Sequence, residues 1–136
     1  MSDFNISYKG NLSTEMEHLE SGQKVLTDAP KDNQGLGRTF SPTDLVASSL
    51  GSCMLTIIAI AGRTHNLNIL SMDSSVSKIM SSASPRRIDA IDVKIDIRGA
   101  FDEKSKTIIE RSAKNCPVHH SLNSNIKINL NINYLK

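Results

Sequence analysis

The chain has 136 residues, of which 38% are apolar and 22% are charged, and it contains no tryptophan. This composition is typical of a folded globular domain and excludes a disordered or fibrous chain. Its 16 basic and 14 acidic residues are scattered and give a formal charge of +2. We expect no nucleic-acid partner, because tracking a phosphate backbone requires clustered cations.

The sequence gives no sign of export or of a membrane span. The opening residues, MSDFNISYKG, lack the basic and apolar regions of a signal peptide, so we expect a cytoplasmic protein. The most apolar run, Leu50 to Ala61, is broken by Gly51, Ser52 and Thr56 and is shorter than a bilayer span. The chain length predicts one domain, residues 1–136, whose core an oligomer could complete.

Alternating apolar residues predict three short strands before residue 29, around Phe4 to Tyr8, Leu12 to Met16 and Val25 to Leu26. The segment that follows, DAPKDNQGLGRTF, has no periodicity and contains Pro and Gly. We therefore expect a long loop there. Long loops in compact domains are often functional.

The next element is a strongly signalled helix that begins at SPTD. Ser41 is a good N-cap, Pro42 suits the first helical position, and Asp44 complements the positive end of the helix dipole. The pattern predicts a helix from Pro42 to about His65. Its apolar residues cover more than one face, so we expect it to be buried on most sides.

The remaining sequence predicts strands and one more long helix. We expect a strand between Leu67 and Met80, and a half-buried strand from Ile91 to Ile97, where apolar and charged residues alternate. FDEKSKTIIERSAKN predicts an amphipathic helix capped by Asp102. Pro117 ends it and starts a short helical turn, and Ile126 to Tyr134 form a last strand. Grouped strands and helices predict an α+β fold.

The two cysteines, Cys53 and Cys116, are too few for a disulfide scaffold in a reducing compartment. Cys53 follows small residues inside the apolar helix, where a free cysteine most often serves as a small buried hydrophobe. Cys116 precedes Pro117 at a predicted helix start, where free backbone N–H groups favour a thiolate. From local sequence, a reactive Cys116 and a merely packed one are equally good interpretations.

The stretch CPVHH also suggests a metal site, because Cys and His at short spacing are zinc ligands. The count is too low, since Cys53 and His65 would have to join from another helix, and specific zinc patterns pair two close-spaced clusters. We therefore interpret His119 and His120 as surface or helix-start residues. No phosphate-binding glycine loop, GxSxG, HExxH or paired-carboxylate motif occurs, so we expect thiol chemistry without a cofactor or metal.

Two charged residues could act on a thiolate. Arg38 follows two glycines in GLGRTF, which free the loop backbone, although a solvated loop charge is the simpler interpretation. Asp44 is already explained as a helix-start acid. It lies on the opposite side of a straight helix from Cys53, because each residue turns the helix by about 100°.

Together, FSPTDLVASSLGSCMLTIIAIA and the later CPVHHSL resemble the OsmC/Ohr family of thiol-dependent peroxidases, in its less characterised OsmC-like branch. The resemblance covers nearly the whole chain. It implies an α+β fold that forms an intertwined homodimer, with antiparallel sheets around two central helices. It also implies that Cys53 attacks an organic hydroperoxide and becomes a sulfenic acid, that Cys116 resolves it as a disulfide, and that a dithiol reductant reopens the disulfide.

The chain departs from the best-characterised members of this family in two places. They hold the thiolate with an arginine from the early strands and a glutamate after the helix proline. Here the strands before residue 29 contain no arginine, and Thr43 follows Pro42. Arg38 and Asp44 are the candidate substitutes, and the alternative function is a non-catalytic binding protein that keeps the fold without an activated thiol.

Overall fold

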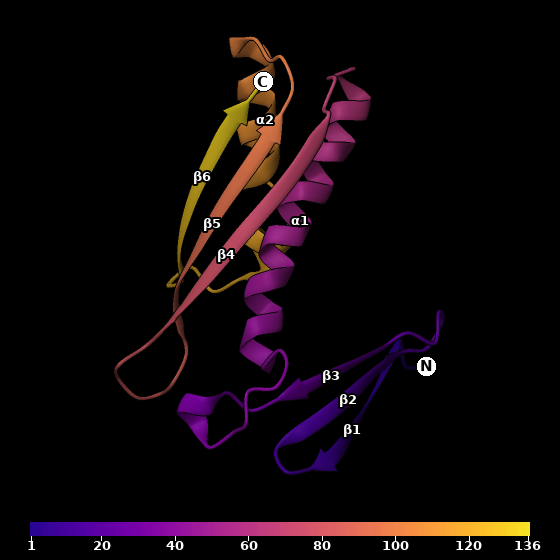
Figure 1. Cartoon of the computed structure of the whole chain (residues 1–136), viewed down its shortest axis with the longest axis vertical. Helices are drawn as coiled ribbons and strands as arrows, with labels where there is room; N and C mark the ends of the chain where they lie inside the picture. The colour runs from indigo at the N-terminus through magenta and orange to yellow at the C-terminus, as the bar shows by residue number, and fades with distance from the viewer. The chain divides into compact units, whose positions relative to one another are not determined.

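A computed structural model describes all residues, 1–136, and divides them into two compact units, Met1–Val46 and Ala47–Lys136. Figure 1 shows their elements, and each unit is described by itself. The single domain of residues 1–136 stays a prediction. The α+β class is confirmed, since the chain contains two three-stranded sheets and a small number of helices.

The first unit is an antiparallel sheet of the three predicted strands. They are β1 (Phe4–Gly10), β2 (Ser13–His18) and β3 (Lys24–Asp28), in the order β1-β2-β3. Ile6 pairs with Met16, which pairs with Val25, so one face of the sheet carries an apolar row. Phe4, Ile6 and Tyr8 are all more than half exposed, so this unit does not bury its own apolar face.

The predicted loop after β3 is present, includes a short 3₁₀ helix, η1 (Lys31–Asn33), and is closed by Asp28. The backbone N–H of Asp28 donates to the carbonyl of Phe40 at 3.0 Å. The Asp28 carboxylate accepts two bonds from the Arg38 guanidinium, at 2.8 and 3.0 Å, and one from the Arg38 backbone N–H at 2.9 Å. Asp28 is only 2% exposed. These bonds hold the pKa of Asp28 at about 2, because they favour the charged carboxylate.

Helix α1 (Pro42–Thr64) begins as predicted and ends one residue before His65. The Asp44 N–H donates to Ser41 Oγ at 3.0 Å, and the Ser41 N–H donates to Asp44 Oδ2 at 2.9 Å. This is a reciprocal capping box. The predicted helix start is thus confirmed.

The second unit contains most of α1 and the elements that follow it, β4 (Ser71–Met80), β5 (Ile88–Arg98), α2 (Glu103–Lys114), α3 (Pro117–Ser121) and β6 (Lys127–Leu135). The Asp102 carboxylate caps α2 by accepting the N–H of Ser105 at 2.8 Å. The sheet order is β4-β5-β6. The expectation of antiparallel sheets is wrong for one pair, since β5 and β6 are parallel. Their connection contains α2 and α3, and such a crossover returns a strand in the same direction.

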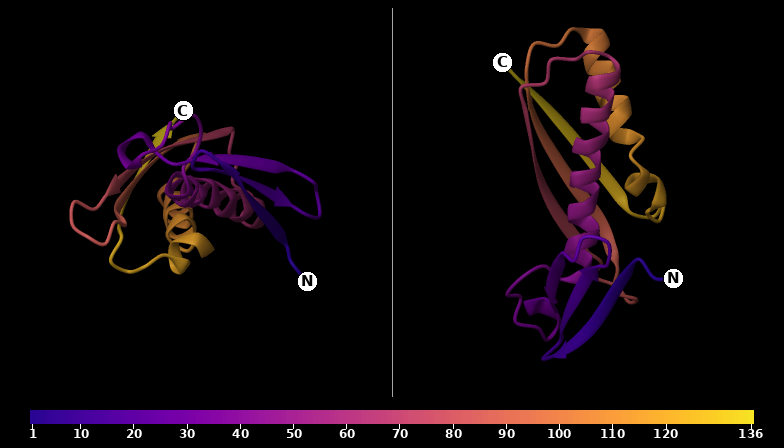
Figure 2. Two further views of the ribbon diagram at one scale, coloured as in Figure 1. Left: turned by 90° about the horizontal axis from the view of Figure 1, so that it is seen from below. Right: turned by 90° about the vertical axis from the view of Figure 1, so that its right-hand side faces the viewer.

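The core of this unit lies between the sheet and the helices, which lie together on one face of the sheet (Figure 2). Strand β5 supplies alternate, almost fully buried residues, namely Ile91, Val93, Ile95 and Ile97. Leu50, Met54 and Ile58 of α1 and Ile109 of α2 are also buried in this cluster. A side chain on Gly51 would come within 2.6 Å of Val76 Cγ2, so a glycine there lets α1 approach β4 closely.

The expectation that α1 is buried on most sides is wrong for the single chain. Only one face is buried, whereas Val46 and Ile60 are 38% and 54% exposed. The expectation that this region is too short to cross a bilayer also needs correction, since α1 has 23 residues and a window of mean hydropathy 1.9. The core helix of a soluble protein can have the same length and hydropathy, so one such helix is weak evidence of a membrane span.

The packing predicts a large effect of shortening Ile95. Because Ile95 is fully buried in the core, Ile95→Ala is expected to lower the free energy of unfolding by about 2–5 kcal/mol. Lys94→Ala, on the exposed face of the same strand, should change it by less than about 0.5 kcal/mol. Urea unfolding followed by circular dichroism measures both, and equal effects would contradict the assigned orientation of β5.

The bonds between the Asp28 carboxylate and Arg38 predict that the stability of the protein falls in acid. The pKa of Asp28 falls from 3.8 to about 2 in the folded chain, so its contribution to stability is fully present above pH 3.8 and is lost as the pH falls towards 2. Asp28→Asn should therefore be less stable than the parent at neutral pH and should lose less stability between pH 4 and pH 2. Melting temperatures across this range measure the difference, with exposed Asp3→Asn as the control. Parallel pH profiles for the parent and Asp28→Asn would refute this role.

Candidate functional site

The candidate site contains the two free cysteines, which come from distant segments and meet in the core of the second unit. Cys53 lies on α1, is partly exposed and packs against the buried cluster. Cys116 is a member of that cluster and is fully buried. Cys53 packs against the buried cluster that contains Cys116, and its thiol adds to the rise in the pKa of Cys116, so the two side chains are near neighbours.

Cys116 occupies the N-cap of α3, as the sequence predicts. Its Sγ accepts the backbone N–H of His119 at 3.2 Å. The expectation that this position favours the thiolate is wrong, however, because burial raises the pKa of the Cys116 thiol above its ordinary value. The His119 N–H opposes this shift, and the adjacent Cys53 thiol adds to it. Desolvation therefore outweighs the helix-start effect.

The two thiols thus differ in exposure. A reagent from solvent meets Cys53 first, whereas Cys116 is shielded and protonated. Such a pair can form a disulfide after the exposed thiol has been oxidised. The arrangement suits thiol redox chemistry in which an accessible sulfur reacts and a buried one follows.

The two candidate activating residues have partners of their own within the first unit. Arg38 is held by Asp28, and this bond raises the pKa of the guanidinium further. Asp44 is engaged in the capping box with Ser41. The sequence analysis overlooked Asp28, because a single acid at the end of a strand carries no pattern that distinguishes a buried clamp from a surface charge.

The histidines do not form a metal site with the cysteines. His120 Nε2 lies 3.3 Å from Asn115 Oδ1, and the rings of His119 and His120 meet edge to face with centroids 5.9 Å apart. No group of three or more His, Cys, Asp or Glu side chains could hold a metal ion. The zinc alternative therefore has no ligand set within one chain.

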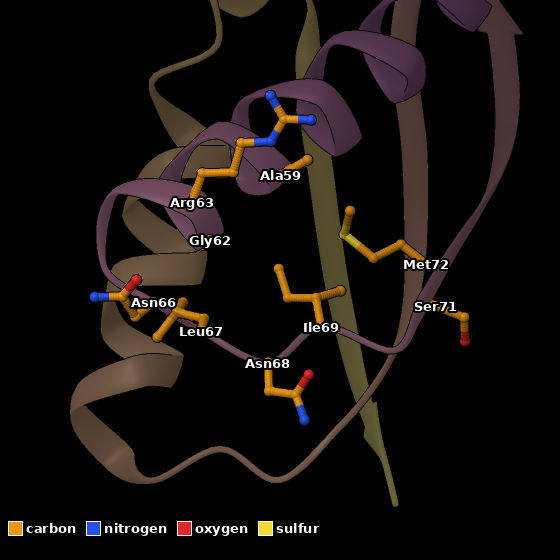
Figure 3. A pocket seen from close by; sticks show the side chains of 9 residues that line it. All are labelled: Ala59, Gly62, Arg63, Asn66, Leu67, Asn68, Ile69, Ser71 and Met72. Carbon is orange, nitrogen blue, oxygen red and sulfur yellow. The ribbon is translucent and has the colours of Figure 1, made fainter.

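Neither cysteine lines any of three surface cavities of the second unit. One of them, of about 610 Å³, lies where α1 ends and β4 begins. Figure 3 shows its polar side chains, Arg63, Asn66 and Asn68, pointing in different directions rather than converging. It thus lacks the convergent polar groups that fix a ligand's orientation in typical binding pockets.

Comparisons with known proteins identify the family of the chain. The family model described as OsmC-like protein matches residues 34–131, which include both cysteines. No curated protein matches the chain significantly.

Solved structures match over nearly the full length. A Psychrobacter arcticus protein, described provisionally as an osmotic stress induced and detoxification response protein, is 40% identical with a TM-score of 0.91, and the match covers 97% of this chain and 96% of that one. An OsmC-like protein from Mycoplasma pneumoniae is 20% identical with a TM-score of 0.84, with 98% and 96% covered. The organic hydroperoxide resistance protein OsmC from Legionella pneumophila is 12% identical with a TM-score of 0.79, with 98% of each chain covered.

The last two likenesses show the fold alone. The family match spans most of the chain and both cysteine motifs, and the Psychrobacter structure extends the likeness to almost every residue. The chain therefore belongs to the OsmC-like protein family.

Proposed function

We propose that the protein is a cytoplasmic thiol peroxidase that reduces organic hydroperoxides, with Cys53 as the attacking residue and Cys116 as the resolving residue. The observation that carries this proposal is that one hydrophobic core brings together a partly exposed and a fully buried cysteine from distant segments. Structural relatives described as organic hydroperoxide resistance proteins support the substrate class.

The proposed cycle balances with two thiols, one peroxide and one dithiol. The Cys53 thiolate attacks the terminal peroxide oxygen, the O–O bond breaks, and the alcohol leaves with a proton while Cys53 becomes a sulfenic acid. The Cys116 sulfur then displaces water from the sulfenic acid and forms a disulfide. A dithiol reductant returns both cysteines to thiols and is itself oxidised to a disulfide.

The difference in exposure sets the order of these steps. The reductant is expected to attack the Cys53 sulfur of the disulfide, because Cys116 is inaccessible in the folded chain. The mixed disulfide then forms on Cys53, and Cys116 leaves and takes up a proton, since burial raises its pKa. Burial of Cys116 also keeps it from reacting with peroxide directly.

A homodimer is part of this proposal. The apolar face of the first unit and apolar residues of α1 such as Val46 and Ile60 are exposed in the single chain, and exposed apolar patches often mark interfaces between proteins. A second copy that covers both would bury them and would enclose α1. Such an assembly would also surround Cys53 with residues that the single chain does not provide.

Replacement of the two cysteines tests the chemistry. With cumene hydroperoxide and a dithiol, Cys53→Ser should lower turnover by roughly 1,000-fold, because it removes the nucleophile. Without the dithiol, Cys116→Ser should consume one equivalent of peroxide and stop as the Cys53 sulfenic acid, which mass spectrometry after dimedone labelling detects. If Cys53→Ser reduces the peroxide as fast as the parent does, the assignment of Cys53 is wrong.

The dimer is tested by light scattering coupled to size-exclusion chromatography. The molar mass that light scattering gives for the parent should be twice the mass of one chain. Ile6→Glu, on the exposed apolar face of the first unit, should shift the equilibrium towards the monomer, whereas Ser7→Glu on the other face should not. A monomeric parent at micromolar concentration would contradict the proposal.

The alternative is a binding protein without catalysis. It is favoured by the engagement of Arg38 with Asp28 and of Asp44 with Ser41, which leaves neither candidate activator dedicated to a thiol. The same peroxide assay separates the two functions. A reduced parent that keeps both thiols through prolonged exposure to cumene hydroperoxide would support the binding protein.

A further inference from the structure

A second cavity of about 560 Å³ lies in the second unit, at the end of the sheet where β5 leads into α2. Its lining includes Leu70 before β4, Gly99 and Phe101 after β5, Lys106 on α2 and Tyr134 on β6. It contains no residue of α1 and neither cysteine. Its volume lies within the range of roughly 300–1,000 Å³ that is usual for small-molecule sites.

The walls of this cavity are mainly apolar and aromatic. The rings of Phe101 and Tyr134 meet edge to face, with centroids 6.1 Å apart. Leu70, which is 63% exposed, adds an aliphatic side chain to the same lining. A Cβ at Gly99 would come within 2.6 Å of Phe101 Cζ, and Gly99 has a φ of +153°, so the backbone makes room for this ring.

Two lysines line this apolar surface, Lys106 on α2 and Lys136 after β6. Lys106 Nζ lies 5.0 Å from the centre of the Tyr134 ring, and the Lys106 side chain is 34% exposed. Lys106 forms an ion pair with Glu103 at 3.7 Å, and the Glu103 side chain is 94% exposed. Such an exposed pair contributes little and is easily exchanged for another anion.

Tyr134 adds no competing charge. Burial raises its pKa to about 12, with smaller contributions from Glu110 and Glu103. Its hydroxyl makes a long hydrogen bond of 3.4 Å to the Lys106 carbonyl. At neutral pH the phenol is therefore uncharged, and its ring serves as an apolar wall and as a support for the Lys106 ammonium.

We propose that this cavity binds a small amphipathic carboxylate, with the anionic head at Lys106 and the aliphatic or aromatic body against Phe101, Tyr134 and Leu70. The ligand's carboxylate replaces that of Glu103 beside the ammonium, and its apolar body covers the exposed Leu70. A neutral analogue makes only the apolar contacts, and an analogue with a cationic head is repelled by Lys106. The site is separate from the thiol pair and does not depend on peroxidase activity.

Calorimetric titration of the full chain with octanoate, 1-octanol and octylamine tests the charge preference. Octanoate is expected to bind about fivefold more tightly than 1-octanol, because one partly exposed ion pair contributes a gain of about this size. Octylamine is expected to bind more weakly than either. Lys106→Met should remove the preference for octanoate while leaving binding of 1-octanol unchanged. Lys104→Met, an exposed lysine on the same helix, is the matched control and should behave like the parent.

Three further measurements test the competing carboxylate and the location of the site. Glu103→Gln should strengthen octanoate binding by about twofold, because it removes the competing carboxylate, and titration by NMR should shift the ring signals of Phe101 and Tyr134. The Cys53→Ser, Cys116→Ser double variant should still bind octanoate, which separates this site from the proposed peroxidase. The absence of octanoate binding, an undiminished preference in Lys106→Met, or shifts confined to residues around Cys53 would each overturn the proposal.

Discussion

The structure of the second unit depends on the burial of one face of β5. Its alternating isoleucine and valine side chains share one buried cluster with residues of α1 and α2, which lie on the same face of the sheet. Burial of such side chains is the main favourable contribution to folding, at about 25 cal/mol for each Å² of apolar surface removed from water. The same cluster includes Cys116 and has Cys53 packed against it.

The difference between the two thiols follows from their depth in this core. Both are bordered by the same cluster, but Cys53 lies on a side of α1 that the chain covers only in part, whereas Cys116 is enclosed. The backbone N–H of His119 favours the Cys116 thiolate, but desolvation opposes it more strongly. A single hydrogen bond at a short helix therefore does not make a fully buried thiol acidic. For this reason we assign the first reaction to Cys53.

The first unit is organised by polar contacts instead. Its sheet leaves an apolar face uncovered, and its loop is held by the Asp28 carboxylate, which binds both the side chain and the backbone of Arg38. A buried carboxylate with several donors is stable only when it is charged and fully bonded. Arg38, for which the sequence favoured a solvated loop charge over a group acting on a thiolate, is thus a structural partner of Asp28 in this chain.

The sequence by itself determined the elements and the family. Periodic apolar residues predicted every strand, the SPTD capping signal located the start of α1, and the two cysteine motifs in their order identified the OsmC-like family. Local interactions define these features, so local patterns reveal them. Only the tertiary structure decided the parallel pairing of β6, the engagement of Arg38 by Asp28, and the burial that raises the pKa of Cys116. Each of these depends on segments far apart in the chain, and desolvation is set by everything that surrounds a group rather than by its sequence neighbours.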